Sequence, residues 1–237
     1  MKNGKTRRIL AFLLAAVMLF TVVPTAFATE ELPGSDESLS DEITVPEDTE
    51  QDDNDGVIAT LTLASQVYVW PVSGHTWLYV ENLSDEPIQV GLYTVPVGEG
   101  VSMGTFSFSV FDGWGIYYNL ESYRTNRDED FYDCTRVTTE LDAAGLEKLN
   151  NALFSYPNMW GLYMNCMGFA FTVWNAVTGD FFVPLILPPF ALFQVMAHSG
   201  STKGLKMCDV PSEKVYKQKG SGESAYLESV GSWTLSL

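Results

Sequence analysis

The chain has 237 residues, and its 30 acidic against 13 basic side chains give a formal net charge of −17 at neutral pH. This acidic surplus opposes binding to nucleic acid, which requires a basic face. Beyond the first 55 residues the chain holds 18 acidic and 9 basic residues, and its roughly 180 residues are enough for one domain with a sizeable core.

The N-terminus has the pattern of a secretory signal peptide, predicted to span residues 1–28. Four basic residues within the first eight precede an uncharged apolar run, Ile9–Val23, and Ala26-Phe27-Ala28 supplies small residues for cleavage after Ala28. The alternative is an uncleaved anchor, but the run is shorter than the roughly 18 residues of a spanning helix. We therefore expect a secreted protein, extracellular or associated with the cell wall, with no membrane span after cleavage.

Residues 29–55 differ in composition from the rest of the chain. They include twelve acidic residues, no basic residue and no aromatic residue. Such a segment cannot bury enough apolar surface to offset the entropy lost on ordering. We predict a self-repelling disordered linker at 29–55 and a single folded domain at 56–237.

The first part of this domain is predicted to be β structure. Runs rich in β-forming residues occupy 57–61, 67–70 and 76–80, with a breaker at 71–74. Residues 75–82 and 88–95 flank a turn-forming segment, which predicts an antiparallel hairpin. Further strands are expected at 103–110 and 114–121.

In the second half of the domain the apolar residues have the spacing of helices. A helix capped by Thr138 or Thr139 carries leucines at 146, 149 and 153 and ends at Pro157. A second helix begins near Cys166 and closes at Gly179, and a third runs from 189 to 197. Short β-like runs occur at 214–217 and 233–237. The predicted fold class is α+β, with an antiparallel sheet packed against helices.

The chain contains three cysteines, Cys134, Cys166 and Cys208. An odd number leaves at least one thiol outside any intrachain disulfide. Either Cys134 and Cys208 are bridged and Cys166 is free, or all three are reduced. Their spacing matches no compact zinc site, and the sequence contains no phosphate loop, dinucleotide fingerprint or metal triad, so no cofactor is expected.

Cys166 is the candidate nucleophile because it lies at the predicted start of a helix. The unpaired N–H groups and the helix dipole there should lower the pKa of the thiol and can bind an oxyanion. His75, at the start of a strand, is the favoured imidazole partner. His198 is the alternative, although its place in the last turn of a helix gives it a sufficient structural role.

The motif Asn165-Cys166-x-x-Phe-Ala-x-x-x-Trp-Asn, preceded by Gly74-His75-x-Trp-Leu-Tyr, resembles circularly permuted papain-like proteins of the NlpC/P60 superfamily. The resemblance covers about residues 67 to 197. It implies that Cys166 is the nucleophile and His75 the general base. Members of the superfamily include peptidases and amidases of cell-wall peptides and acyltransferases on lipids.

A third residue should orient the imidazole by binding its other nitrogen. In the predicted hairpin His75 faces Thr94, which we therefore assign to this role. Gln89 reaches the site only if the strand register slips by one residue or a bulge intervenes.

Two functions follow. The first is an exported cysteine amidase or peptidase that acts on a peptide or amide, with peptidoglycan as the first substrate to try. The alternative is a non-catalytic extracellular binding domain on the same fold, with Cys166 buried and unreactive.

Overall fold

The computed structural model describes residues 56–69, 73–106, 115–125, 127, 132–157, 165–184, 188–220 and 222–230. The predicted signal peptide, the acidic linker and the C-terminal run at 233–237 lie outside the described residues.

An antiparallel sheet of eight strands forms the centre of the described domain, in the order β10-β9-β6-β5-β2-β1-β7-β8. A separate two-stranded sheet consists of β3 and β4. The strands are β1 (Ala59–Val69), β2 (Ser73–Asn82), β3 (Ile88–Val90), β4 (Tyr93–Val95), β5 (Gly100–Gly104), β6 (Tyr117–Tyr118), β7 (Thr135–Leu141), β8 (Thr202–Lys203), β9 (Tyr216–Lys219) and β10 (Tyr226–Ser229).

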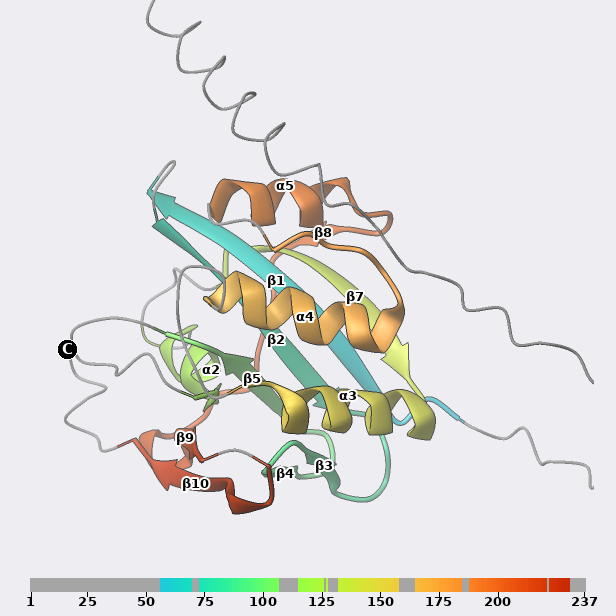
Figure 1. The fold of residues 1–237 in the computed structure, drawn as a ribbon, viewed down its shortest axis with the longest axis vertical. Coiled ribbons are helices and arrows are strands. Elements are labelled where there is room, and N and C mark those ends of the chain that lie inside the picture. The colour runs from blue at the N-terminus through green and yellow to red at the C-terminus, as the bar shows by residue number, and fades with distance from the viewer. Residues whose placement is uncertain are drawn as a thin grey trace, which may run out of the picture. The chain divides into compact units, whose positions relative to one another are not determined.

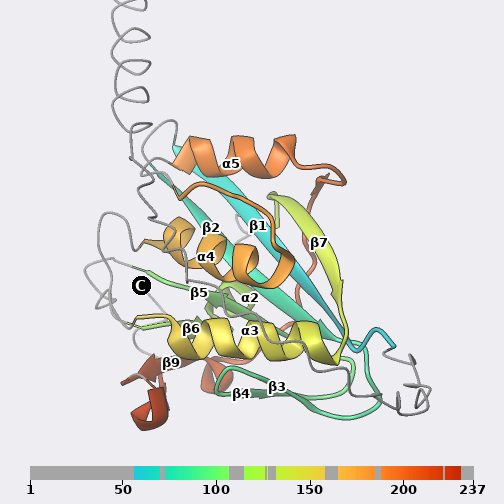
Figure 2. The ribbon, with the colours of Figure 1, turned by 45° about the vertical axis from the view of Figure 1, so that its right-hand side comes forward.

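Helices cover the sheet, and three of them, α3, α4 and α5, lie one beside another across one face (Figures 1 and 2). The helices are α2 (Leu120–Thr125), α3 (Ala143–Ser155), α4 (Cys166–Thr178) and α5 (Pro188–Ala197), with single 3₁₀ turns η2 (Ser212–Lys214) and η3 (Gly222–Ser224). The fold class is thus α+β with a large antiparallel sheet, as predicted.

The two faces of the sheet bury two separate apolar clusters. On β2, Leu78 and Val80 pack in the cluster that includes α3, α4 and α5, whereas Trp77 and Tyr79 pack in the cluster that includes Leu120 of α2. This alternation follows from the two-residue period of a β-strand. Both faces of the central strands are therefore buried, and α2 covers the face opposite to α4.

The predicted helix at Cys166 is confirmed, since α4 begins at that residue and ends before Gly179, whose φ of 76° is the left-handed C-cap conformation. The predicted cap at Thr138 or Thr139 is wrong. Both threonines belong to β7, where Thr138 pairs with Thr62 of β1. The N-cap of α3 is Asp142, whose side chain accepts a hydrogen bond from the N–H of Gly145.

The predicted hairpin of 75–82 with 88–95 is also wrong. β2 pairs with β1 and β5, so that His75 faces Gln66, and residues 88–95 pair only with one another. The side chain of Asn82 donates hydrogen bonds to the carbonyls of Glu86, Val95 and Pro96 at 2.9, 3.2 and 3.2 Å. These bonds hold the chain in a turn at the end of β2 and separate β3 and β4 from the main sheet.

The predicted strand at 114–121 is reduced to the two residues of β6. Asn119 then adopts a φ of 68°, a left-handed conformation that Asn tolerates better than most residues. Its side-chain amide donates to the carbonyl of Lys214 at 3.0 Å. The reversal at Asn119 ends the strand and starts α2, which brings Glu121 under the sheet.

Candidate active site

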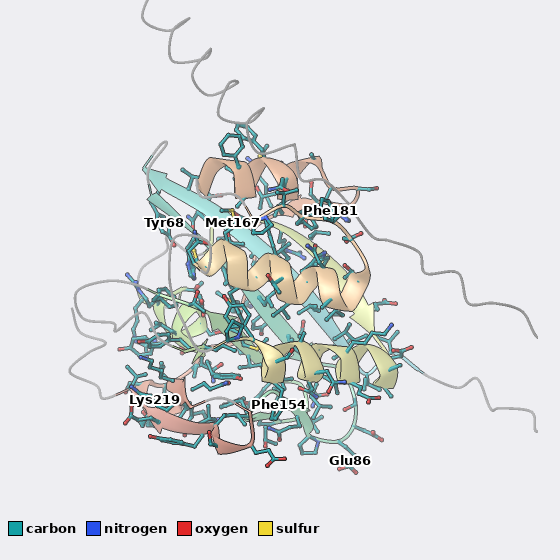
Figure 3. The ribbon with its side chains drawn as sticks, in the orientation of Figure 1. Tyr68, Glu86, Phe154, Met167, Phe181 and Lys219 are labelled. Atoms are coloured by element: carbon teal, nitrogen blue, oxygen red, sulfur yellow. The ribbon has the colours of Figure 1, made fainter. Side chains whose placement is uncertain are left out.

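The thiol of Cys166 lies at the first residue of α4. Asn165 caps this helix, and its side-chain oxygen accepts a hydrogen bond from the N–H of Gly168 at 2.9 Å. Cys166 is partly buried. In Figure 3 the side chain of the next residue, Met167, marks this end of the helix. The N–H groups of a helix's first turn have no acceptor within the helix, so the thiol lies among backbone donors.

His75, near the start of β2, forms a side-chain hydrogen bond with Cys166. The imidazole is only 5% exposed. It stacks between two aromatic rings, with ring centroids 5.5 Å from Trp77 and 4.4 Å from Phe106. These contacts fix the plane of the imidazole. The structure therefore brings together the two residues that the sequence predicted as nucleophile and base, although they are 91 positions apart.

The third residue of the site is Glu121, which the sequence analysis missed. Its Oε1 lies 2.9 Å from Nε2 of His75, and its side chain is fully buried. With Nε2 engaged, Nδ1 is the ring nitrogen that remains for the thiol. A Cβ atom at residue 104 would overlap Oε1 of Glu121 and lie 3.1 Å from Nε2 of His75. Gly104 thus provides the space in which the carboxylate meets the imidazole.

The charges of these three groups stabilise one another. Burial alone would lower the pKa of His75, but the hydrogen bonds and charges of Cys166 and Glu121 outweigh it and raise the pKa to about 9. Burial alone would raise the pKa of Cys166, but the contact with His75 and the N–H groups of Thr76 and Met167 lower it. Each of the two groups therefore favours the charged form of the other, a thiolate beside an imidazolium.

Thr94 is not the orienting residue, and that prediction is wrong. It lies on β4, outside the main sheet, and its side chain is exposed. Its hydroxyl donates to Oε1 of Gln89 at 2.9 Å. The error follows directly from the hairpin that was predicted for 75–82 and 88–95. The sequence did carry one signal for Glu121, an acidic residue directly after Leu120 in a segment rich in large hydrophobic side chains, where a buried carboxylate needs a specific partner.

His198 is not the partner of Cys166. Its Nε2 lies 3.0 Å from Oδ2 of Asp180, and its ring stacks on Phe182 at 5.3 Å. Asp180 follows the last residue of α4, whereas Cys166 is the first. A 13-residue helix is about 20 Å long, so the two histidines serve opposite ends of α4.

Tyr156, directly after α3, is a further residue that the sequence analysis did not select. Its hydroxyl is buried, and no hydrogen-bond partner for it lies among the described residues. Burial and the charge of Cys166 both raise its pKa. The hydroxyl is therefore a protonated donor within electrostatic reach of the thiol.

All three cysteines are free, so the structure contains no bridge between Cys134 and Cys208. Cys134 is buried, which raises the pKa of its thiol to about 12. Cys208 lies beside Tyr79, whose hydroxyl donates to its sulfur at 3.3 Å. Of the three thiols, Cys166 alone contacts an imidazole.

Within the described ranges there is no group of three or more His, Cys, Asp or Glu side chains that could hold a metal ion. No helix in this part of the chain is both long and apolar enough to cross a membrane. Comparisons of the chain with protein-family models, curated proteins and solved structures find no match. The site brings together a polarised thiol, an oriented imidazole and nearby donors, which are the groups used in nucleophilic acyl transfer.

Proposed function

We propose that the protein is an exported cysteine amidase or peptidase with a permuted papain-like domain of the NlpC/P60 type. The observation that carries this proposal is the hydrogen-bonded series Cys166, His75 and Glu121, in which a helix-start thiol meets an imidazole held by a buried carboxylate. The order along the chain, with the histidine strand before the cysteine helix, supports the permuted arrangement. A solely structural Cys166 would not require a charged partner of this kind.

In the proposed reaction the Cys166 thiolate attacks the carbonyl carbon of an amide, and the carbonyl oxygen becomes an oxyanion. The N–H group of Cys166 itself and the hydroxyl of Tyr156 are the donors assigned to that oxyanion, because the N–H groups of Gly168 and Phe169 already bond to Asn165. The imidazolium of His75 then gives its proton to the amine as the C–N bond breaks, which leaves a thioester. Water attacks the thioester, His75 accepts a proton from it, and the acid is released as the thiolate re-forms.

Glu121 holds the imidazole in one orientation and stabilises its protonated form. Because Glu121 contacts His75 and not the reacting atoms, we assign it a positioning role. Cell-wall peptide is the substrate class to test first. The signal-peptide pattern predicts export, and members of the NlpC/P60 superfamily, which the sequence resembles, commonly act on cell-wall peptides.

The test is hydrolysis of isolated peptidoglycan and its peptides, together with alkylation by iodoacetamide at neutral pH. Cys166→Ala should lower hydrolysis at least about 10⁴-fold and abolish the fast alkylation. Tyr156→Phe, which removes only a hydroxyl, should lower kcat roughly 10- to 100-fold with little change in KM. Cys208→Ser is the matched control and should leave both readouts unchanged.

Full hydrolysis by Cys166→Ala would end the proposal. Slow alkylation of Cys166 in the wild type, at the rate of an ordinary thiol, would instead support the non-catalytic binding domain.

A further inference from the structure

A small cavity lies between the β3–β4 hairpin, the C-terminal half of α3 and the β9–β10 hairpin, and none of the residues of the thiol site lines it. Its volume is about 250 Å³, below the roughly 300–1,000 Å³ of pockets that hold drug-sized ligands. Figure 3 shows Phe154, one of its lining residues, at the end of α3, whereas Met167 lies at the start of α4. The cavity therefore suits a ligand of about one sugar or amino-acid residue.

The walls of this cavity are fixed by hydrogen bonds within the protein. The side chain of Asn150 donates to the carbonyl of Gln89 at 2.9 Å and accepts from the N–H of Gly91 at 2.7 Å, which ties α3 to the β3–β4 hairpin. The amide of Gln89 accepts from Thr94 and donates to the carbonyl of Gly91. Because these bonds join protein groups to one another, they hold the walls of the cavity in place.

Gln218 supplies a buried donor to the cavity. Its residue is only 4% exposed, and its Oε1 accepts a hydrogen bond from the hydroxyl of Tyr118 at 3.1 Å. This bond fixes the amide, so that Nε2 is the atom left to face the cavity that Gln218 lines. Among the described residues, no hydrogen-bond acceptor is found for Nε2. A donor held in place by a largely buried side chain favours a ligand that brings an acceptor.

The remaining lining is apolar or uncharged. Leu92, Leu153 and Phe154 provide the apolar surface, and Phe154 is 52% exposed at the rim, where Asn151 adds an exposed amide. No acidic or basic side chain among the described residues lines the cavity, although the chain carries a net charge of −17. A charged ligand would lose hydration there without gaining an opposite charge.

We propose that this cavity binds one N-acetylated sugar residue. An acetamido group places a single carbonyl acceptor beside a methyl group and carries no charge, which matches one fixed donor beside a leucine-lined surface. The carbonyl accepts from Nε2 of Gln218, the methyl group packs on Leu153, and the apolar face of the sugar ring lies on Phe154. The inference does not depend on the thiol chemistry, because the two sites share no residue.

The test is ligand-observed saturation-transfer NMR on the full chain with N-acetylglucosamine, glucose and N-acetylglycine N-methylamide. We expect N-acetylglucosamine to bind with a Kd of roughly millimolar order, with the strongest transfer to the acetamido methyl, and at least about tenfold more tightly than glucose or the peptide amide. Phe154→Ala and Gln218→Glu should each weaken binding at least about fivefold, whereas Phe181→Ala should not, because Phe181 is 87% exposed and does not line the cavity. Phe154 is exposed, so its variant keeps the test valid if Gln218→Glu does not fold.

Equal binding of glucose would overturn the proposal, and so would equal binding of the peptide amide or unchanged binding by Phe154→Ala. Cys166→Ala should bind the sugar normally. Loss of hydrolysis with retained sugar binding in that variant separates this site from the proposed catalytic one.

Discussion

The molecule contains two histidine–carboxylate pairs of almost equal length and very different surroundings. Nε2 of His75 lies 2.9 Å from Glu121, and Nε2 of His198 lies 3.0 Å from Asp180. The side chains of the first pair are 5% and 0% exposed, and those of the second are 28% and 35% exposed. The two pairs thus share nearly the same distance between imidazole and carboxylate. They differ in burial and in the group that the other nitrogen of the imidazole contacts.

That third partner determines what each pair can do. His75 contacts a thiol, whereas the other nitrogen of His198 lies 2.8 Å from the carbonyl oxygen of Ser199. Asp180 also accepts a hydrogen bond from Nε1 of Trp174 at 2.9 Å. The second pair therefore joins the end of α4 to the end of α5, while the first pair is joined to a thiol. A histidine beside a carboxylate indicates chemistry only when the free nitrogen meets a reactive group.

The largest expected difference between the pairs concerns activity. His75→Ala should lower kcat/KM for the amide substrate about 10²- to 10⁴-fold, because the general base is lost. His198→Ala should change it by less than about twofold. Steady-state kinetics on the two variants measures both effects, and comparable losses would show that the two pairs are not functionally distinct.

Glu121→Gln separates the charge of the carboxylate from its hydrogen bond. The variant keeps an acceptor for His75 but removes the negative charge, and we expect kcat/KM to fall at least about tenfold. In the wild type, activity should decline as the Cys166 thiolate is protonated at acidic pH and as His75 loses its proton near pH 9. Glu121 raises the pKa of His75, so the alkaline decline should move to lower pH in the variant.

A pH–rate profile of the wild type and Glu121→Gln tests the direction in which the alkaline decline of activity moves. An alkaline limb at the same pH in both proteins would show that Glu121 does not stabilise the imidazolium.

Gly104→Ala tests the packing that the buried pair requires. The added Cβ would overlap Oε1 of Glu121, so we expect a loss of about 1–3 kcal/mol in the free energy of unfolding, together with a severalfold loss of activity. Gly56→Ala is the matched control, because nothing lies within 4 Å of its Cβ position. Denaturant unfolding of both variants gives the comparison, and equal stabilities would contradict the close packing at Gly104.

The smallest effect is expected at the less buried pair, His198 and Asp180. Hydrogen bonds from Trp174 and His198 lower the pKa of Asp180 despite the opposing effect of burial. Its contribution to stability is therefore present above the unfolded-state pKa and is lost as the pH falls through the lower folded-state value. Asp180→Asn should cost less than about 1 kcal/mol at pH 7, since solvent screens the pair, and nothing at low pH. Urea denaturation of the wild type and the variant at the two pH values measures this difference in the free energy of unfolding. A difference that persists at low pH would show that it does not come from the charge of Asp180.

The residues whose roles depend on local structure were predictable from sequence. Gly179 and the apolar spacing after Cys166 predicted α4 nearly to the residue, and the position of the cysteine at the start of that helix made it the candidate nucleophile. His75 could then be chosen as the imidazole partner of Cys166 because the chain offers only two histidines. These inferences needed only helix caps, spacing and elimination.

Glu121 could not be found in the same way, because its role depends on strand pairing. A turn-forming segment after β2 favoured a local hairpin, whereas β2 pairs with β1 and β5. The hydrogen bonds of Asn82 that redirect the chain are tertiary and leave little trace in composition. An error in the partner of one strand therefore moved the third site residue from Glu121 to Thr94.

The three groups of the thiol site come from β2, α2 and α4, segments that are far apart until the sheet is complete. An extended chain would carry a sulfhydryl of ordinary acidity, with no imidazolium to ionise it. The cysteine of an unfolded chain is thus chemically quiet, and it becomes reactive only when the last of these segments is in place. Maturation of the domain would itself switch on its reactivity.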